Sequence, residues 1–385
     1  MSYIGKTPTS VPLTSSDIED GIITSAKIAN GGVETVDIAD ANVTAAKLAS
    51  GTVQNQSAFK NIIINGDMSI AQRSTSVASI TSTGYHTMDR WNWQADFGTV
   101  TLSQDTDVPT GQGFATSFKA DVTTAGTVSS SGTVILRQKV EGQNLQYLKK
   151  GTANAESTTL SFWIKSTKTG TYICELYDVD NTRQISKSYT IDTTNTWEKK
   201  TLTFAGDTSG AFGNDNANSL QINWYLSAGT DFTSGTLSTT WTSSTNANRA
   251  VGQVNAQDNT SNNIYITGVQ LEAGTTASDF EFLPHDVNYG RCERYYHKTA
   301  QFTWFIVGRS LGTGVAIGRY FFRNTMRASP TMSQSGDWNT SSGFGGVPTF
   351  SEIDQNGTAL RSAASTTANT NLWMNDGVVI AEAEL

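Results

Sequence analysis

The sequence predicts an all-β protein that begins with a thin segment unable to fold alone. Between residues 60 and 288, alternating apolar and polar runs are separated by clusters of Gly, Asn, Asp and Ser, a pattern typical of strands joined by turns. No part of this region has a convincing helical period. Residues 17–53 instead repeat every ten residues, with a branched apolar residue at every fifth position. These observations predict short extended pieces and strands along most of the chain.

The composition narrows the class of ligand. The 385 residues include 26 Lys and Arg against 34 Asp and Glu, a formal net charge of −8, and only 16% are charged. Because nucleic acids and anionic bilayer surfaces bind clustered basic residues, we expect neither kind of binding. No apolar run approaches 18 residues, so no membrane insertion is expected either. A polar, uncharged surface that carries aromatic rings suits a neutral hydrogen-bonding ligand, of which glycans are the obvious class.

The repeat cannot bury its own apolar residues. Five steps along a helix or a strand do not return a side chain to the same face, so neither element gives one apolar stripe. Asp-Gly and Asn-Gly steps supply turns between the apolar positions. Neighbouring chains must therefore complete the core, unless the segment is a disordered linker. The predicted inward positions are Ile18, Ile23, Ile28, Val33, Ile38, Val43, Leu48 and Val53.

The repeat, together with the opening segment from Met1 to Pro8, resembles the N-terminal shafts of bacteriophage tail fibres. The resemblance implies an elongated homotrimer in which two identical partner chains complete an intertwined shaft over residues 17–57. It also implies that residues 1–16 dock on the virion tail, on a tail tube, adaptor or nozzle protein. Tyr3, Ile4 and Gly5 are the predicted docking residues.

Residues 58–290 are predicted to form a two-sheet sandwich or jelly roll. Clear strands are expected at 159–166 and 219–229, and a hairpin turn is expected within 170–192. Passages 61–74, 89–93 and 268–284 resemble the carbohydrate-binding-module type of jelly roll found in tail fibres. Residues 291–299 resemble the short helical connector that follows such domains.

Five aromatic residues of this region carry separate predictions. Trp91, Phe162, Trp163 and Trp197 lie in regular strand patterns, so core packing is predicted for their rings. Trp241 lies in a polar, loop-like stretch and is predicted to contact a glycan, although packing as a core tryptophan stays open.

Residues 300–385 start a new β-rich pattern that resembles the small trimeric tip domains of tail fibres, here expected as a small β-sandwich. In such fibres the tip usually meets the host surface, and loops commonly carry function. Two loops rich in Gly, Asn and Ser are the candidates. The predicted receptor-binding residues are Trp338, Asn339, Phe344, Asp354 and Asn356, with packing in the trimer interface as the alternative for Trp338.

Cofactor chemistry is not expected. Cys174 and Cys292 are isolated and are predicted to be buried, reduced thiols. Three scattered histidines offer no zinc spacing, and no metal or other cofactor is predicted. Residues 178–181 could in principle bind calcium, but a plain hairpin turn is the preferred interpretation.

An enzyme is not predicted either. The run from Gly308 to Gly312 matches the nucleophile-elbow pattern, but a second strand follows it instead of a helix, and all histidines precede the serine. Glycoside hydrolysis needs two carboxylates at a set separation, which the sequence cannot test.

Taken with the resemblance, these patterns predict a virion tail fibre that is assembled in the host bacterial cytoplasm. Its distal β domains would recognise a host cell-surface polysaccharide such as lipopolysaccharide and so mediate adsorption. The alternatives are a head fibre or other virion decoration protein, or a fibre with glycan depolymerase activity. A free bacterial lectin fits less well, because the N-terminus shows no signal-peptide pattern.

Overall fold

The chain divides into two compact units, residues 1–56 and 57–385. The computed structural model describes residues 59–300, 306–309, 314–336, 338–340, 347–364, 371–375 and 377–385. The docking residues Tyr3, Ile4 and Gly5 and the eight apolar positions of the repeat lie outside the described residues. The shaft and the trimer therefore stay predictions. Among the described residues, no helix is long and apolar enough to cross a membrane.

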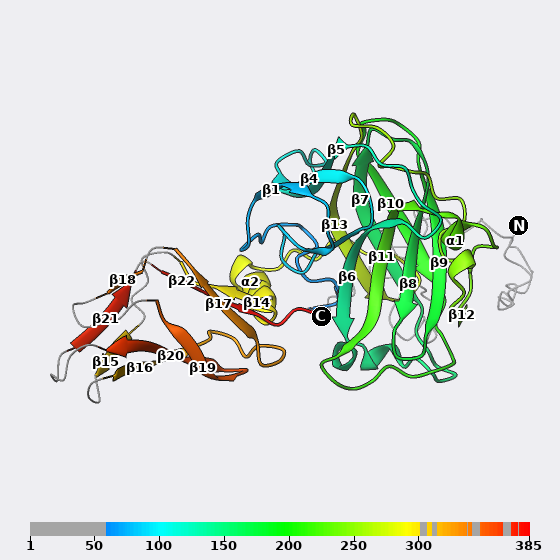
Figure 1. Ribbon diagram of the computed structural model, residues 1–385. Coiled ribbons are helices and arrows are strands. Elements are labelled where there is room, and N and C mark those ends of the chain that lie inside the picture. Colours follow the sequence, from blue (N-terminus) through cyan, green and yellow to red (C-terminus); the bar gives the residue numbers. More distant parts are fainter. Residues whose placement is uncertain are drawn as a thin grey trace, which may run out of the picture. The chain divides into compact units, whose positions relative to one another are not determined.

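Two antiparallel sheets form a sandwich, as expected for the middle of the chain (Figure 1). The six-stranded sheet runs β1 (Ser76–Ile80), β4 (Thr99–Asp105), β5 (Ser117–Thr124), β13 (Asn263–Ala273), β7 (Thr158–Ser166) and β10 (Glu198–Phe204). The seven-stranded sheet runs β12 (Thr242–Ser243), β9 (Arg183–Ile191), β8 (Gly170–Asp178), β11 (Asn218–Ala228), β6 (Thr133–Glu141), β3 (Asn92–Ala95) and β2 (Gly84–Tyr85).

Aromatic rings fill the space between the sheets. Trp224 of β11 lies at the centre, with its ring centroid 5.5 Å from Trp91 and 5.9 Å from Phe162. Trp91 and Phe162 are 2% and 0% exposed, so their predicted core packing is confirmed. Each such side chain contributes about 1.5–3 kcal/mol of hydrophobic stabilisation.

Trp163 and Trp197 are not in this core, which corrects the prediction for both. Successive strand residues face opposite sides of a sheet, so Trp163 points away from the interior that its neighbour Phe162 fills. Trp197 precedes β10, and its indole nitrogen donates a hydrogen bond to the Asp107 carboxylate at 2.9 Å. Its ring lies edge-on to Tyr265, with the centroids 6.1 Å apart.

A connecting segment covers part of the outer face of the seven-stranded sheet. It carries the short helices α1 (Thr230–Thr233) and η7 (Asn246–Asn248) and packs Ala250 and Phe232 against Tyr225. Arg249 donates two hydrogen bonds of 2.8 Å to the fully buried Glu175 carboxylate. The buried charge is thereby paired within the fold.

The connecting helix is present but lies earlier than predicted. Helix α2 spans His285–Glu293, whereas Tyr296–Lys298, within the predicted helical range 291–299, forms strand β14. Pro284 caps the start of the helix with a ψ of 141°, an extended conformation that a residue inside a helix cannot adopt. Cys292 on this helix and Cys174 on β8 are free and buried, as predicted.

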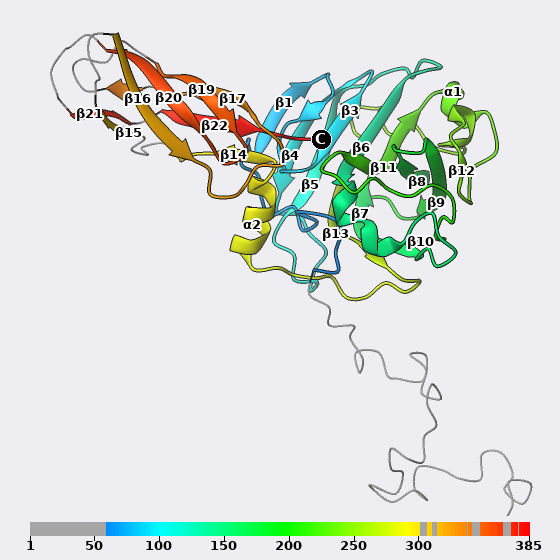
Figure 2. The same ribbon diagram turned by 90° about the horizontal axis from the view of Figure 1, so that it is seen from below.

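The C-terminal region forms three small antiparallel sheets around Leu360 and Val379, beyond helix α2 in both views (Figures 1 and 2). The first contains β14, β22 (Val378–Glu382) and β17 (Thr331–Ser335). The second contains β15 (Ile306–Arg309), β21 (Asn371–Asn375) and β18 (Asn339–Thr340). The third contains β16 (Gly314–Phe321), β20 (Gly357–Ala364) and β19 (Thr349–Asp354).

The last residues of the chain return to the sandwich. Arg73 contacts the carboxylates of Glu382 and Glu384 at 3.1 and 3.3 Å. Arg327 donates hydrogen bonds to the carbonyls of Ala383 and Glu384 at 2.7 and 3.0 Å. The amine of Lys139 on β6 donates to the Leu385 carbonyl at 2.5 Å. The contacts of Arg73 and Lys139 join the C-terminal strands to the sandwich, and Arg327 adds a hydrogen bond to the Asn216 carbonyl at 3.0 Å.

Candidate functional site

Trp338 is partly buried in the C-terminal region. Its ring lies over Gly377, where a Cβ atom would come within 2.0 Å of the indole, and its nitrogen donates to the Gln334 side chain at 2.7 Å. Asn339 lies in strand β18, and Phe344 is outside the described residues. The ring packs against the local core around Val379, so its predicted receptor role stays untested.

Asp354 and Asn356 lie together in the turn between β19 and β20. The Asp354 carboxylate accepts hydrogen bonds from the backbone N–H groups of Asn356 and Gly357 at 2.6 and 2.9 Å. These backbone bonds lower the pKa of Asp354, and Arg319 contacts the same carboxylate at 2.9 Å. This turn belongs to the sheet of β16, β19 and β20, whereas Trp338 lies between β17 and β18, which belong to the other two sheets. The structure therefore brings together only part of the predicted tip site.

Trp241 directly precedes strand β12, at the edge of the seven-stranded sheet. The indole nitrogen donates to the Ala205 carbonyl at 2.7 Å, and the partly buried ring packs against the main core. The ammonium of Lys150 lies 5.2 Å from the ring centroid, within cation–π range. The ring is therefore part of the fold, and its predicted glycan contact stays a prediction.

Lys150 itself occupies a cage of oxygen atoms. Its ammonium contacts the carboxylates of Asp178 and Asp207 at 2.5 and 3.0 Å, and the carbonyls of Ser209 and Gly210 at 3.1 and 2.7 Å. Asp178 also accepts a bond from the backbone of Asn181 and so shapes the hairpin turn between β8 and β9. Residues 178–181, for which calcium is the less favoured interpretation, form a hairpin turn in which the Asp178 carboxylate pairs with the Lys150 ammonium.

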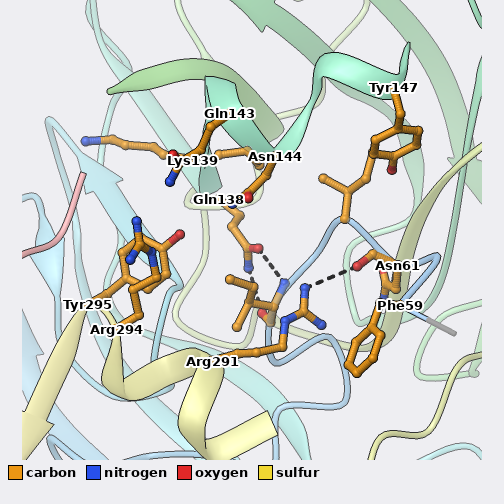
Figure 3. Close-up of a pocket in the computed structure, with 13 residues that line it drawn as sticks. Phe59, Asn61, Gln138, Lys139, Gln143, Asn144, Tyr147, Arg291, Arg294 and Tyr295 are labelled. Carbon is orange, nitrogen blue, oxygen red and sulfur yellow. Dashed lines mark hydrogen bonds between the residues drawn. The ribbon is translucent and has the colours of Figure 1, made fainter. Parts of the chain in front are cut away.

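A cavity of about 390 Å³ lies where the first described residues, the end of β6 and helix α2 meet (Figure 3). Two short helices, η5 (Gly142–Asn144) and η6 (Gln146–Leu148), form one wall. The lining combines aromatic, amide and cationic side chains with a few aliphatic ones. The cavity is lined by Phe59, Asn61, Ile62, Ile64, Gln138, Lys139, Val140, Gln143, Asn144, Tyr147, Arg291, Arg294 and Tyr295.

Two aromatic side chains at this cavity are largely open to solvent. Phe59 is 60% exposed and Tyr147 is 48% exposed, among the highest values for large apolar side chains in the described part of the chain. The Glu281 carboxylate fixes the backbone at Phe59 and Asn61, accepting their N–H groups at 2.5 and 3.0 Å. Flat rings held at the rim of a cavity provide surfaces on which a ligand ring can stack.

Hydrogen bonds fix the orientation of two amide side chains that line the cavity. The Gln138 amide accepts from the Ile64 nitrogen at 2.8 Å and donates to the Ile64 carbonyl at 2.9 Å. Gln143 is bonded through its amide nitrogen to Glu141 at 2.6 Å, while Asn144 is exposed at the opposite wall from Arg291. Amide groups offer both donors and acceptors to ligand hydroxyls.

The cationic side chains differ in how they are paired. Arg294 makes a two-pronged contact with the Glu141 carboxylate, at 2.8 and 2.7 Å, and these hydrogen bonds raise the pKa of Arg294. Arg291 donates only to the Asn61 carbonyl, at 3.2 Å, and has no ion pair within 4.0 Å among the described residues. Burial lowers the pKa of Arg291 because its charge has partly lost water, and the nearby Glu281 carboxylate, which acts in the opposite direction, does not offset this effect.

None of the cavity residues was predicted from the sequence. Arg291 and Asn61 are 230 positions apart, and only the packing of α2 beside the first described residues joins them. A usable signal exists for Tyr147, an aromatic residue in the polar stretch between β6 and β7, because Trp241 is a candidate for the same reason.

No family model and no curated protein matches this chain. Solved structures that match include the enzymatically active domain of tailspike protein 4 from bacteriophage CBA120, at 18% identity over 56% of this chain and 21% of that one, with a TM-score of 0.30. The carbohydrate-binding module TmCBM61, solved with β-1,4-galactotriose, matches at 10% identity over 55% of this chain and 98% of its own, with a TM-score of 0.29.

An arabinose-bound α-L-arabinofuranosidase, MgGH51, matches at 14% identity over 58% of this chain and 29% of its own, with a TM-score of 0.28. These matches contradict the prediction that the chain is not an enzyme, because they include an enzymatically active tailspike domain and a glycosidase. We withdraw that prediction. With TM-scores near 0.3, the matches assign no reaction and no ligand to this chain.

Proposed function

We propose that the chain is a subunit of a phage tail fibre that recognises a glycan on the host cell surface. The observation that supports this most is the cavity at helix α2, which combines two exposed rings with amide and guanidinium donors. A saccharide has apolar C–H faces and a rim of hydroxyls, so it needs both kinds of surface at once.

The cavity also has a suitable size. Small-ligand sites measure roughly 300–1,000 Å³ and hold a few polar groups that fix orientation. At about 390 Å³ this cavity would accommodate one or two sugar rings. Tyr147 and Phe59 would stack on the rings, while Asn144 would bond a hydroxyl.

The fibre role rests on the N-terminal repeat. Its apolar columns need partner chains, and we propose a homotrimer in which two identical chains complete the shaft. Tyr3, Ile4 and Gly5 would dock on a tail tube, adaptor or nozzle protein, which places the chain in the virion tail. A head fibre or another decoration protein is the alternative, and immunogold labelling of virions separates the two by position.

Saccharide binding by the full-length chain tests the recognition site. We expect Tyr147→Ala to weaken binding of host lipopolysaccharide or capsular polysaccharide about two- to twelvefold, because contact with an aromatic ring contributes about 0.5–1.5 kcal/mol. Phe321→Ala is the matched control, since Phe321 is 65% exposed and lies on β16, outside the cavity. Equal binding by Tyr147→Ala and the native chain would remove the cavity from the proposal.

Two further measurements separate the alternatives for the same protein. Trp338→Ala, assayed for adsorption to host cells, tests the tip: a loss there with normal binding by Tyr147→Ala would move the receptor site to the C-terminal sheets. Release of soluble oligosaccharide from host polysaccharide would identify a fibre with depolymerase activity.

A further inference from the structure

We propose that the cavity at helix α2 selects saccharides that carry a carboxylate, with Arg291 as the group that pairs with it. This inference rests on the proposed glycan recognition and adds the chemical class of the ligand. It departs from the composition of the chain, which suggested a neutral ligand.

The charge of the lining carries the first part of the argument. Lys139, Arg291 and Arg294 line the cavity, and none of its 13 lining residues is acidic. Two carboxylates lie just outside the lining, because Glu141 pairs with Arg294 and Glu281 accepts from the backbone of Phe59 and Asn61. The cations that line the cavity without an ion pair among the described residues are therefore Lys139 and Arg291. A concave, low-dielectric site of one sign concentrates ligands of the other sign.

Hydrogen bonding narrows the role to one residue. Arg294 is already paired with the Glu141 carboxylate. The ammonium of Lys139 donates to the Leu385 carbonyl, and its side chain extends away from Phe59 and Tyr147 (Figure 3). Arg291 uses one of its five N–H groups on the Asn61 carbonyl, and no other bond to it is described. The planar edge of a guanidinium that remains open fits a carboxylate through two parallel hydrogen bonds.

Desolvation adds a reason for affinity. Arg291 is half-buried, and that burial lowers its pKa without an ion pair to compensate for the lost water. An incoming carboxylate would make the close ion pair that the more distant Glu281 carboxylate does not make. Arg249, in contrast, meets Glu175 at 2.8 Å inside the fold, so the same cost is already offset there.

The geometry supports a sugar acid rather than a small anion. Figure 3 shows Arg291 on one wall and Asn144 and Tyr147 on the other, with Phe59 beside the Arg291 wall. A pyranose ring lying against an aromatic ring could direct a carboxylate to Arg291 and a hydroxyl to Asn144. An inorganic anion would use Arg291 and leave both rings without a partner.

Matched saccharide pairs test the inference by calorimetry on the full chain. The pairs are trigalacturonate and sialyllactose, each with its own carboxyl-reduced neutral form. We expect at least tenfold tighter binding of the acid in one pair, weakened by 0.5 M salt, which screens the charge. Arg291→Gln should lower the affinity for the acid at least tenfold more than the affinity for the neutral form and so abolish that preference. Arg323→Gln, an exposed arginine outside the cavity, should preserve it.

Every other outcome overturns a specific part of the proposal. Equal binding of acid and neutral forms overturns the acidic-sugar class and leaves glycan recognition in place. A preference that persists in Arg291→Gln overturns the role of Arg291. If none of the four saccharides binds while the native chain still adsorbs to host cells, the inference fails and the proposed function stands; if adsorption is also absent, both fail.

Discussion

Lys150 is a buried cation, and Arg291, on helix α2, is a half-buried one. The two differ in the groups that surround their charge. The Lys150 ammonium contacts two carboxylates and two backbone carbonyls, all within 3.1 Å. Arg291 contacts one carbonyl at 3.2 Å. One charge is neutralised by the fold, and the other is left open beside a cavity. The comparison shows that burial alone does not identify a charge that can bind a ligand. What matters is whether carboxylates of the fold already pair with that charge.

The largest expected effect comes from removing the paired cation. Lys150→Met keeps the apolar stem but leaves Asp178 and Asp207 buried beside each other. We expect the free energy of unfolding to fall by about 3–5 kcal/mol, the usual result of removing one partner of a buried ion pair. Urea unfolding followed by tryptophan fluorescence measures this. Arg291→Met is the matched control and should cost about 1 kcal/mol or less, so equal losses would break the comparison.

The buried carboxyl group of Asp89 should make the stability of the protein depend on pH, because it has no close ion pair among the described residues. Asp89 is fully buried, its nearest cation Arg73 is 4.0 Å away, and burial raises the pKa of Asp89 from 3.8 to about 6. The folded protein therefore binds more protons than the unfolded chain between pH 4 and 6. The stability contributed by protonated Asp89 is present below pH 4 and is lost as the pH rises through 6, by roughly 2–3 kcal/mol in total.

Asp89→Asn isolates this contribution. The variant should lack it, so the difference in unfolding free energy between native and variant chains should change by that amount from pH 4 to pH 7. Denaturant titrations at four pH values within this range measure the difference. A difference that is flat with pH would show that Asp89 is ionised at both ends, held by Gln72 and Arg73.

Calcium should partly replace the lysine ammonium. The oxygen atoms around Lys150 are carboxylates and carbonyls, the ligands that calcium prefers. We expect Lys150→Ala to regain about 1.4 kcal/mol at a calcium concentration ten times its dissociation constant, and the native chain to gain nothing. Thermal unfolding with and without calcium tests this, with magnesium as the control ion; identical shifts in both chains would contradict it.

The smallest effect is expected at the cavity rim. Tyr147→Ala and Phe59→Ala remove side chains that are 48% and 60% exposed, so unfolding free energies should change by about 0.5 kcal/mol or less. Thermal unfolding at matched concentration measures this. A loss above about 2 kcal/mol in either variant would mean that the ring supports the fold, and a binding defect of that variant would then say nothing about stacking.

Local pattern predicted the strands well and the direction of individual side chains less well. The expected strands at 159–166 and 219–229 are β7 and β11 within a residue or so, and the turn within 170–192 joins β8 to β9. Period-two alternation placed Phe162 correctly, but the same argument should have turned Trp163 outward. Trp197 was misplaced because it stands just before β10, where an alternation read along the strand no longer applies.

The sequence by itself determined that the chain is all-β, because alternation and turn residues act over a few neighbouring positions. That the N-terminal repeat needs partner chains stays a prediction. Only the tertiary structure decided which charges are paired. Lys150 reaches Asp178 and Asp207 from 28 and 57 positions away, and Arg291 comes beside Asn61 from 230. A desolvated charge is costly or useful according to neighbours that local sequence does not specify, so the candidate site appears only when the sheets and helix α2 are packed together.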